Sequence, residues 1–300
     1  MKKILYIVYF VLVLLLVGLM GGAWYFSTVL LNPGPHGCPK DHYVYCSDPS
    51  ELKLGFENIT YKTVDGFNIS AWYIPGNPGA PGVLMVHGRG ATRREALRYV
   101  PSLHQAGFNL LLIDTRNCGE SDKSFNSMGY HERKDVHGGI DYLLNVKKVP
   151  VTGVFGYSMG ASTSIMAMAE NQKIKAGVFE SGFTDFKTVV RQVAERDYGL
   201  PYFPMIPIVT FFFEIRGDID TDTPTPLKVI NSIAPRPIFL IHGTADQQVY
   251  FSHGEALFQA AGSPKQLWTV SGGKHTQAWQ ADRAKAETDI PAFFLRSLRN

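Results

Sequence analysis

The pentapeptide Gly-Tyr-Ser-Met-Gly at residues 156–160 places Ser158 where it could act as a nucleophile. The apolar run before it predicts a β-strand, and the small residues from Ala161 onward predict a helix. A nucleophile on such a strand-to-helix turn has a positive φ, so residues two positions away must be small. Gly156 and Gly160 meet that need. This context favours nucleophilic chemistry over an ordinary serine in a chain with 29 glycines.

A serine hydroxyl needs a base, and a histidine oriented by a carboxylate would supply one. Asp246 follows the predicted strand 237–243, and His275 follows the predicted strand 265–273. Both residues therefore lie at strand ends, on the same edge of the sheet as Ser158. We predict Asp246 as the acid and His275 as the base.

Other candidates fit less well. Asp114 ends a third apolar run and is the second choice for the acid. His87 and His242 each end a strand in a His-Gly pair, which indicates structural support of the loops. His253 lies on a predicted helix and is expected to be packed or solvated.

Backbone N–H groups would complete the site by holding a developing oxyanion. One donor is expected from Met159, the residue after the nucleophile, and the other from Arg89 in the loop after the strand 82–88. The side chain of Arg89 could also meet a substrate carboxylate or phosphate. The alternative is an exposed arginine on a loop.

The elements that must position these residues alternate along the chain. Eight predicted strands are interleaved with helices, which indicates an α/β fold with a mostly parallel sheet covered on both faces. Thr92 and Glu95 have the spacing of a capping box at the start of one helix. The predicted strands occupy residues 56–63, 67–74, 82–88, 108–116, 151–156, 174–182, 237–243 and 265–273.

Residues 183–233 interrupt this alternation with many aromatic residues and prolines. Because ligands bind at the carboxyl edge of such sheets, we expect a cap, either a lid or the wall of an acyl pocket. The alternative is a structural excursion packed on the core. The three phenylalanines at 211–213 could instead touch a membrane surface.

The N-terminal segment predicts a transmembrane helix. Residues 4–31 carry no charge and exceed the roughly 20 apolar residues that cross a bilayer. Lys2 and Lys3 before the run would keep the N-terminus cytoplasmic, leaving the rest outside the cytoplasm. The alternative is a cleaved signal peptide, with a cleavage site near residues 21–23. We assign residues 1–31 to a signal anchor, 32–52 to a stalk and 53–300 to the main domain.

The cysteines indicate the redox compartment, and the net charge indicates which kinds of binding partner to expect. Cys38 and Cys46 could form a disulfide in an oxidising compartment, although two free thiols fit the spacing as well. Cys118 is expected to be a buried filler. The net charge is only +3 and no basic stripe is present, so no nucleic acid partner is expected. No metal-ligand spacing is present, and neither a metal nor a cofactor is expected.

The motifs Val-His-Gly-Arg-Gly, Asp-Thr-Arg-Asn-Cys-Gly-Glu-Ser, Gly-Tyr-Ser-Met-Gly, His-Gly-Thr-Ala-Asp-Gln-Gln-Val and Gly-Gly-Lys-His occur in an order that resembles the α/β-hydrolase superfamily. With its N-terminal span, the chain is most similar to membrane-anchored Bem46-like hydrolases, which serine aminopeptidase-like profiles also match. The resemblance implies Ser158 as nucleophile, Asp246 as acid and His275 as base.

We therefore expect a serine hydrolase of esters or thioesters with a small-molecule or lipid acyl substrate. An amidase or peptidase with the same triad is the first alternative. A membrane-tethered binding protein that keeps the fold without turnover is the second. The oligomeric state is left open.

Overall fold

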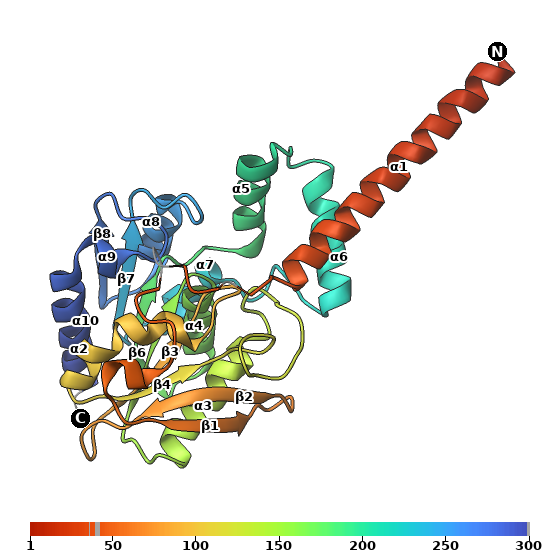
Figure 1. Ribbon diagram of the computed structural model, residues 1–300. Coiled ribbons are helices and arrows are strands. Elements are labelled where there is room, and N and C mark those ends of the chain that lie inside the picture. The colour runs from red at the N-terminus through yellow and green to blue at the C-terminus, as the bar shows by residue number, and fades with distance from the viewer. Residues whose placement is uncertain (36, 40–42, 299–300) are drawn as a thin grey trace.

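The computed structural model describes residues 1–35, 37–39 and 43–298 (Figure 1). Its centre is an eight-stranded sheet in the order β1-β2-β4-β3-β5-β6-β7-β8. β1, β2 and β4 pair antiparallel, and all other neighbours pair parallel, as the sequence predicts. The strands are β1 (Glu57–Lys62), β2 (Asn68–Ile74), β3 (Gly82–Val86), β4 (Asn109–Ile113), β5 (Thr152–Tyr157), β6 (Ile174–Glu180), β7 (Ile238–Gly243) and β8 (Lys265–Val270).

Both faces of the sheet are covered by helices. Successive residues of a strand point to opposite faces, so each strand contributes to two apolar clusters. In β3, Val83 and Met85 join one buried apolar cluster, whereas Leu84 and Val86 join the other. The first cluster includes α2 (Val100–Gln105) and α10 (Arg283–Ser297). The second includes α3 (Arg133–Asn145), α4 (Met159–Glu170) and α8 (Phe251–Ala260). Short helical segments complete the main body: η1 (Pro49–Leu52), η2 (Arg93–Arg98) and α9 (Ala278–Ala281).

One local prediction is wrong. The helix expected to start at Thr92 begins instead as the 3-10 helix η2, and Thr92 makes no side-chain cap bond. Glu95 does not reach back to Thr92 as a capping box requires. Its carboxylate accepts a hydrogen bond from the N–H of Gly88 at 2.7 Å, in the loop after β3. Glu95 therefore supports the loop rather than the helix end.

The N-terminal helix α1 (Lys2–Leu31) projects from the body of the protein, with α6 (Met205–Gly217) beside its C-terminal part (Figure 1). It is long and apolar enough to cross a membrane, a property that signal sequences share. Residues 2–18 are exposed, whereas Ala23, Ser27 and Leu31 are buried. This four-residue spacing forms one stripe along the helix. We call residues 22–31 the docked end of α1.

Polar contacts fix the docked end. Arg216, in the last turn of α6, donates to the carbonyl of Trp24 at 3.1 Å, to Ser27 Oγ at 2.6 Å and to Thr28 Oγ1 at 2.8 Å. Its guanidinium also lies 3.9 Å from the centre of the Trp24 ring. Because these contacts involve both backbone and side chains, the docked end is part of the domain rather than only an anchor.

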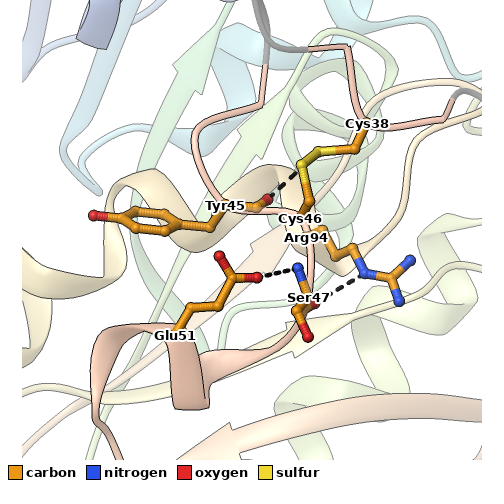
Figure 2. Close-up of a disulfide and its surroundings, with 6 residues drawn as sticks. All are labelled: Cys38, Tyr45, Cys46, Ser47, Glu51 and Arg94. Carbon is orange, nitrogen blue, oxygen red and sulfur yellow. Dashed lines mark hydrogen bonds between the residues drawn. A yellow bond between two sulfur atoms is a disulfide. The ribbon is translucent and has the colours of Figure 1, made fainter.

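The segment after α1 is not a free stalk where the structure describes it. A disulfide joins Cys38 to Cys46, and Arg94 Nε donates to the carbonyl of Ser47 at 2.9 Å (Figure 2). Tyr43 is buried, and Leu52 packs against the core. Residues 36 and 40–42 of the predicted stalk lie outside the described residues. Cys118 is a buried free thiol, as expected.

The cap predicted at 183–233 consists of α5 (Phe186–Tyr198), α6, α7 (Pro226–Val229) and the 3-10 helix η3 (Ile230–Ile233). The three phenylalanines of α6 have different surroundings. Phe213 is buried and stacks on Phe186 with ring centres 4.4 Å apart, and Phe212 meets Trp24 of α1 edge to face. Phe211 is exposed. The cap thus packs against the docked end of α1 through α6, and its α7 and η3 contact α4 and α8 of the main body.

Candidate active site

Ser158 sits at the junction of β5 and α4 with φ 52° and ψ −120°, a strained conformation for a residue with a side chain. The two flanking glycines make this turn possible. A Cβ on Gly156 would lie 2.3 Å from the carbonyl oxygen of Gly160. A Cβ on Gly160 would lie 2.2 Å from the carbonyl oxygen of Val86 in β3. Close backbone packing therefore requires glycine at both positions.

The structure brings Ser158, His275 and Asp246 together from three separate loops. His275 Nε2 lies 2.8 Å from Ser158 Oγ, and His275 Nδ1 lies 2.8 Å from Asp246 Oδ2. An ionised carboxylate accepts the proton on Nδ1, so Nε2 is left free to accept from the serine hydroxyl. This arrangement is that of a nucleophile, a base and an orienting acid.

Asp246 is buried, yet its environment favours the ionised form. Burial opposes the charge, but hydrogen bonds from His242 and His275 outweigh that effect. Together they hold the pKa of Asp246 well below its usual range. Its second oxygen, Oδ1, accepts the backbone N–H groups of Gln248 and Val249, both at 2.9 Å. The carboxylate is therefore both charged and held in one orientation.

The two predicted oxyanion donors border the cavity beside Ser158. The N–H of Met159 is the first in α4 and has no acceptor within that helix. In the loop after β3, the N–H of Gly88 is already bonded to Glu95. Among the described residues, the backbone N–H of Arg89 has no acceptor. The backbone therefore has two N–H groups available beside the serine.

The side chain of Arg89 corrects the expectation of an exposed arginine. It is half-buried and points to the docked end of α1. Its Nη2 donates to the carbonyl of Val29 at 2.7 Å and to that of Leu30 at 3.2 Å. Its Nη2 is thus engaged by the backbone of α1. The last carbonyls of a helix lack intrahelical donors, which explains this contact.

A buried polar network that sequence reasoning missed supports the His275 loop. Glu180, at the end of β6, accepts from Tyr99 Oη at 2.8 Å and from the N–H of Ala278 at 2.9 Å. Arg98 lies 4.0 Å from Glu180 and donates to the carbonyl of Thr276 at 3.0 Å. Charged residues are expected on the surface, so no local signal marked these as buried. The network therefore holds the chain immediately after His275.

The alternative acid and the loop histidines have structural roles. Asp114 accepts the N–H groups of Arg93 at 2.8 Å and Glu120 at 3.1 Å, which shapes the loop after β4. His87 accepts the N–H of Thr115 at 3.0 Å through Nε2. His242 Nε2 lies 2.8 Å from the carbonyl of Val249, which supports the Asp246 loop.

His253 contacts Thr184 at the start of the segment 183–233, and its protonation predicts how stability depends on pH. It is buried, and its Nδ1 accepts the N–H of Thr184 at 3.1 Å. Burial, with a smaller effect of nearby His242, lowers its pKa from 6.5 to about 4. Between these values the unfolded chain binds more protons, so stability is lost as pH falls through this window. We expect a loss of about 3 kcal/mol from this group. In urea titrations at pH 7 and 4.5, His253→Asn should lose less stability on acidification than the wild type does.

A cavity of about 640 Å³ lies beside Ser158, His275 and the two N–H donors. Three helices contribute apolar residues to its lining. α5 contributes Val189 and Val190, α6 contributes Ile206 and Val209, and α1 contributes Phe26, Val29 and Leu30. α5 also contributes the charged residues Arg196 and Asp197. The volume and the largely apolar lining are typical of a small-molecule site. Several of these lining residues belong to the segment 183–233.

Comparisons with known proteins agree with the fold. A family model described as the alpha/beta hydrolase fold matches residues 81–207. The chain is similar to "Uncharacterized protein YqkD" of Bacillus subtilis, with 26% identity over 76% of this chain and 75% of that protein. It is 23% identical to "Thiohydrolase aneE" of Aspergillus aculeatus over 40% of this chain and 39% of that protein.

Among solved structures, esterase Pf2001 of Pyrococcus furiosus superposes with a TM-score of 0.73 and 23% identity. The match covers 90% of this chain and 99% of the esterase. At this identity the likeness concerns the fold. The sheet order, the turn at Ser158 and these matches together lead to one conclusion: the chain has the α/β-hydrolase fold.

Proposed function

We propose that this protein is a serine hydrolase that cleaves carboxylic ester or thioester bonds of lipophilic acyl substrates. The observation that carries the proposal is the 2.8 Å contact of His275 with both Ser158 and Asp246, beside an apolar cavity. The fold, an esterase neighbour and a thiohydrolase relative support hydrolytic activity.

The geometry suits a two-step acyl transfer. Ser158 Oγ attacks the carbonyl carbon while His275 Nε2 takes the hydroxyl proton, and Asp246 stabilises the imidazolium. The N–H groups of Met159 and Arg89 bind the oxyanion. Collapse of the tetrahedral intermediate breaks the bond to the leaving alcohol or thiol, which receives the proton from His275. Water, deprotonated by the same nitrogen, then attacks the acyl-enzyme, releases the acid and restores the serine.

The shape of the cavity supports the preference for lipophilic acyl groups. Ser158 and His275 border it, and most of the residues that the cap and α1 contribute to its lining are apolar. We infer that an acyl chain lies along those walls. Each buried methylene contributes about 0.8 kcal/mol, so turnover should rise with chain length until the cavity is full.

We further infer that α1 anchors the protein in a membrane, with the N-terminus cytoplasmic and the domain on the opposite side. Lys2 and Lys3 precede the span, and the Cys38–Cys46 disulfide suits an oxidising compartment. The part of α1 before the docked end, residues 2–21, is about 30 Å long, which matches the hydrocarbon core of a bilayer.

One labelling experiment tests nucleophile and orientation together. A membrane-impermeant fluorophosphonate applied to intact cells should label the full-length wild type but not Ser158→Ala. Labelling only after lysis would reject the orientation and keep the nucleophile. No labelling of the folded protein in lysate would reject the hydrolase. With purified protein, equal turnover of p-nitrophenyl esters of all chain lengths would reject the lipophilic substrate, and amide cleavage at similar rates would favour an amidase.

A further inference from the structure

The docked end of α1 borders the same cavity as Ser158. We propose that it is a part of the active site: Phe26 and Leu30 form a wall of the acyl-binding cavity and help to set which acyl chain lengths are cleaved. This inference rests on the proposed function. It gives a second role, in substrate selection, to a helix that has the composition of a membrane anchor.

The wall is continuous with the cap. The Phe26 ring meets the ring of Tyr198, at the end of α5, edge to face with centres 5.1 Å apart. Leu30 packs against the buried cluster that contains Met159 and Phe183. Met159 is the residue after the nucleophile, so this cluster extends from α1 to the reacting centre. An acyl chain that leaves Ser158 would therefore meet α1 side chains.

The position of the wall is fixed by polar contacts at the end of the helix. Arg89 carries one of the proposed oxyanion N–H groups, and its guanidinium holds the carbonyls of Val29 and Leu30. The N–H of Asn126 donates to the carbonyl of Leu31 at 2.6 Å. Arg89 thus links two parts of the proposed site: the loop that would bind the oxyanion and the helix that lines the cavity. A helix that only anchored the chain would need none of these contacts.

The test uses the full-length protein in detergent micelles with p-nitrophenyl esters from butanoyl to hexadecanoyl. Leu30→Trp should fill part of the cavity and lower kcat/KM for long chains relative to butanoyl by about tenfold, the effect of displacing roughly two methylenes. Leu30→Ala should shift the optimum towards longer chains. The two substitutions change the volume in opposite directions, so a folding defect in one cannot produce both results.

Leu16→Trp is the matched control, since Leu16 is an exposed leucine on the part of α1 outside the domain. Its chain-length profile should equal that of the wild type. If both Leu30 variants keep the wild-type profile while fluorophosphonate still labels Ser158, the wall is wrong and the proposed hydrolase stands. If wild-type protein is not labelled, the proposed function itself has failed. If fluorophosphonate does not label Leu30→Trp, the chain-length profile of Leu30→Ala decides whether Leu30 forms part of the wall.

Discussion

Replacing His275 by alanine should lower kcat/KM for an activated ester by about 10⁵-fold or more, which corresponds to roughly 7 kcal/mol. The reason is the geometry at Ser158. In the part of the chain that the structure describes, His275 Nε2 is the only base within 2.8 Å of the Ser158 hydroxyl. Without that base the hydroxyl is a poor nucleophile at neutral pH. Steady-state kinetics with p-nitrophenyl butanoate would measure the loss.

Comparing the activities of the single and double variants distinguishes residues that act as one unit from residues that act independently. Ser158→Ala/His275→Ala should be no slower than either single variant, because residues that act as one unit lose their effect together. His104→Ala is the control, since the one hydrogen bond of the His104 ring in the described part of the chain is to the carbonyl of Pro75. Activity within tenfold of wild type in His275→Ala would show that another group accepts the serine proton.

The second large effect concerns stability. Gly160→Ala should destabilise the protein by about 3 kcal/mol or more and abolish labelling of Ser158. The new Cβ would lie 2.2 Å from the carbonyl oxygen of Val86 and 2.4 Å from that of His87. Backbone atoms cannot turn away as a side chain does, so β3 and α4 must separate. The loop after β3 carries Arg89, and its displacement would disturb the oxyanion site as well.

Urea denaturation and fluorophosphonate labelling would measure both consequences. Gly55→Ala is the matched control, because a Cβ there meets nothing within 4 Å. Its stability should stay within about 0.5 kcal/mol of the wild type. A Gly160→Ala protein with wild-type stability and labelling would show that the turn at Ser158 tolerates a wider separation of β3 and α4.

The sequence was sufficient for the sheet and for the placement of the three candidate residues, because both depend on local patterns. Short apolar runs bounded by glycine marked the buried strands, and their carboxyl ends had to meet at one edge. Ser158, Asp246 and His275 each follow such a run. The aromatic residues of 183–233 break the alternation, which is why the sequence predicts a cap there.

Features that depend on distant partners could not be predicted. Thr92 and Glu95 have the spacing of a capping box, but Glu95 forms a tertiary bond to Gly88 that no local rule contains. Arg98 and Glu180 are charged residues that are buried only because each meets the other and the His275 loop. A uniformly apolar helix likewise gives no sign of which side packs on protein, so the docked end of α1 appeared only in the structure.

The fixed contact between α1 and the domain has a kinetic consequence. With α1 in a bilayer as proposed, the contacts of Arg216 and Arg89 with α1 would hold Ser158 at a fixed height above the membrane. The proposed hydrolase would then meet a lipid substrate by lateral diffusion in two dimensions. Its rate should follow the mole fraction of that lipid in the bilayer, and diluting the substrate with inert lipid should slow turnover even when the bulk concentration is unchanged.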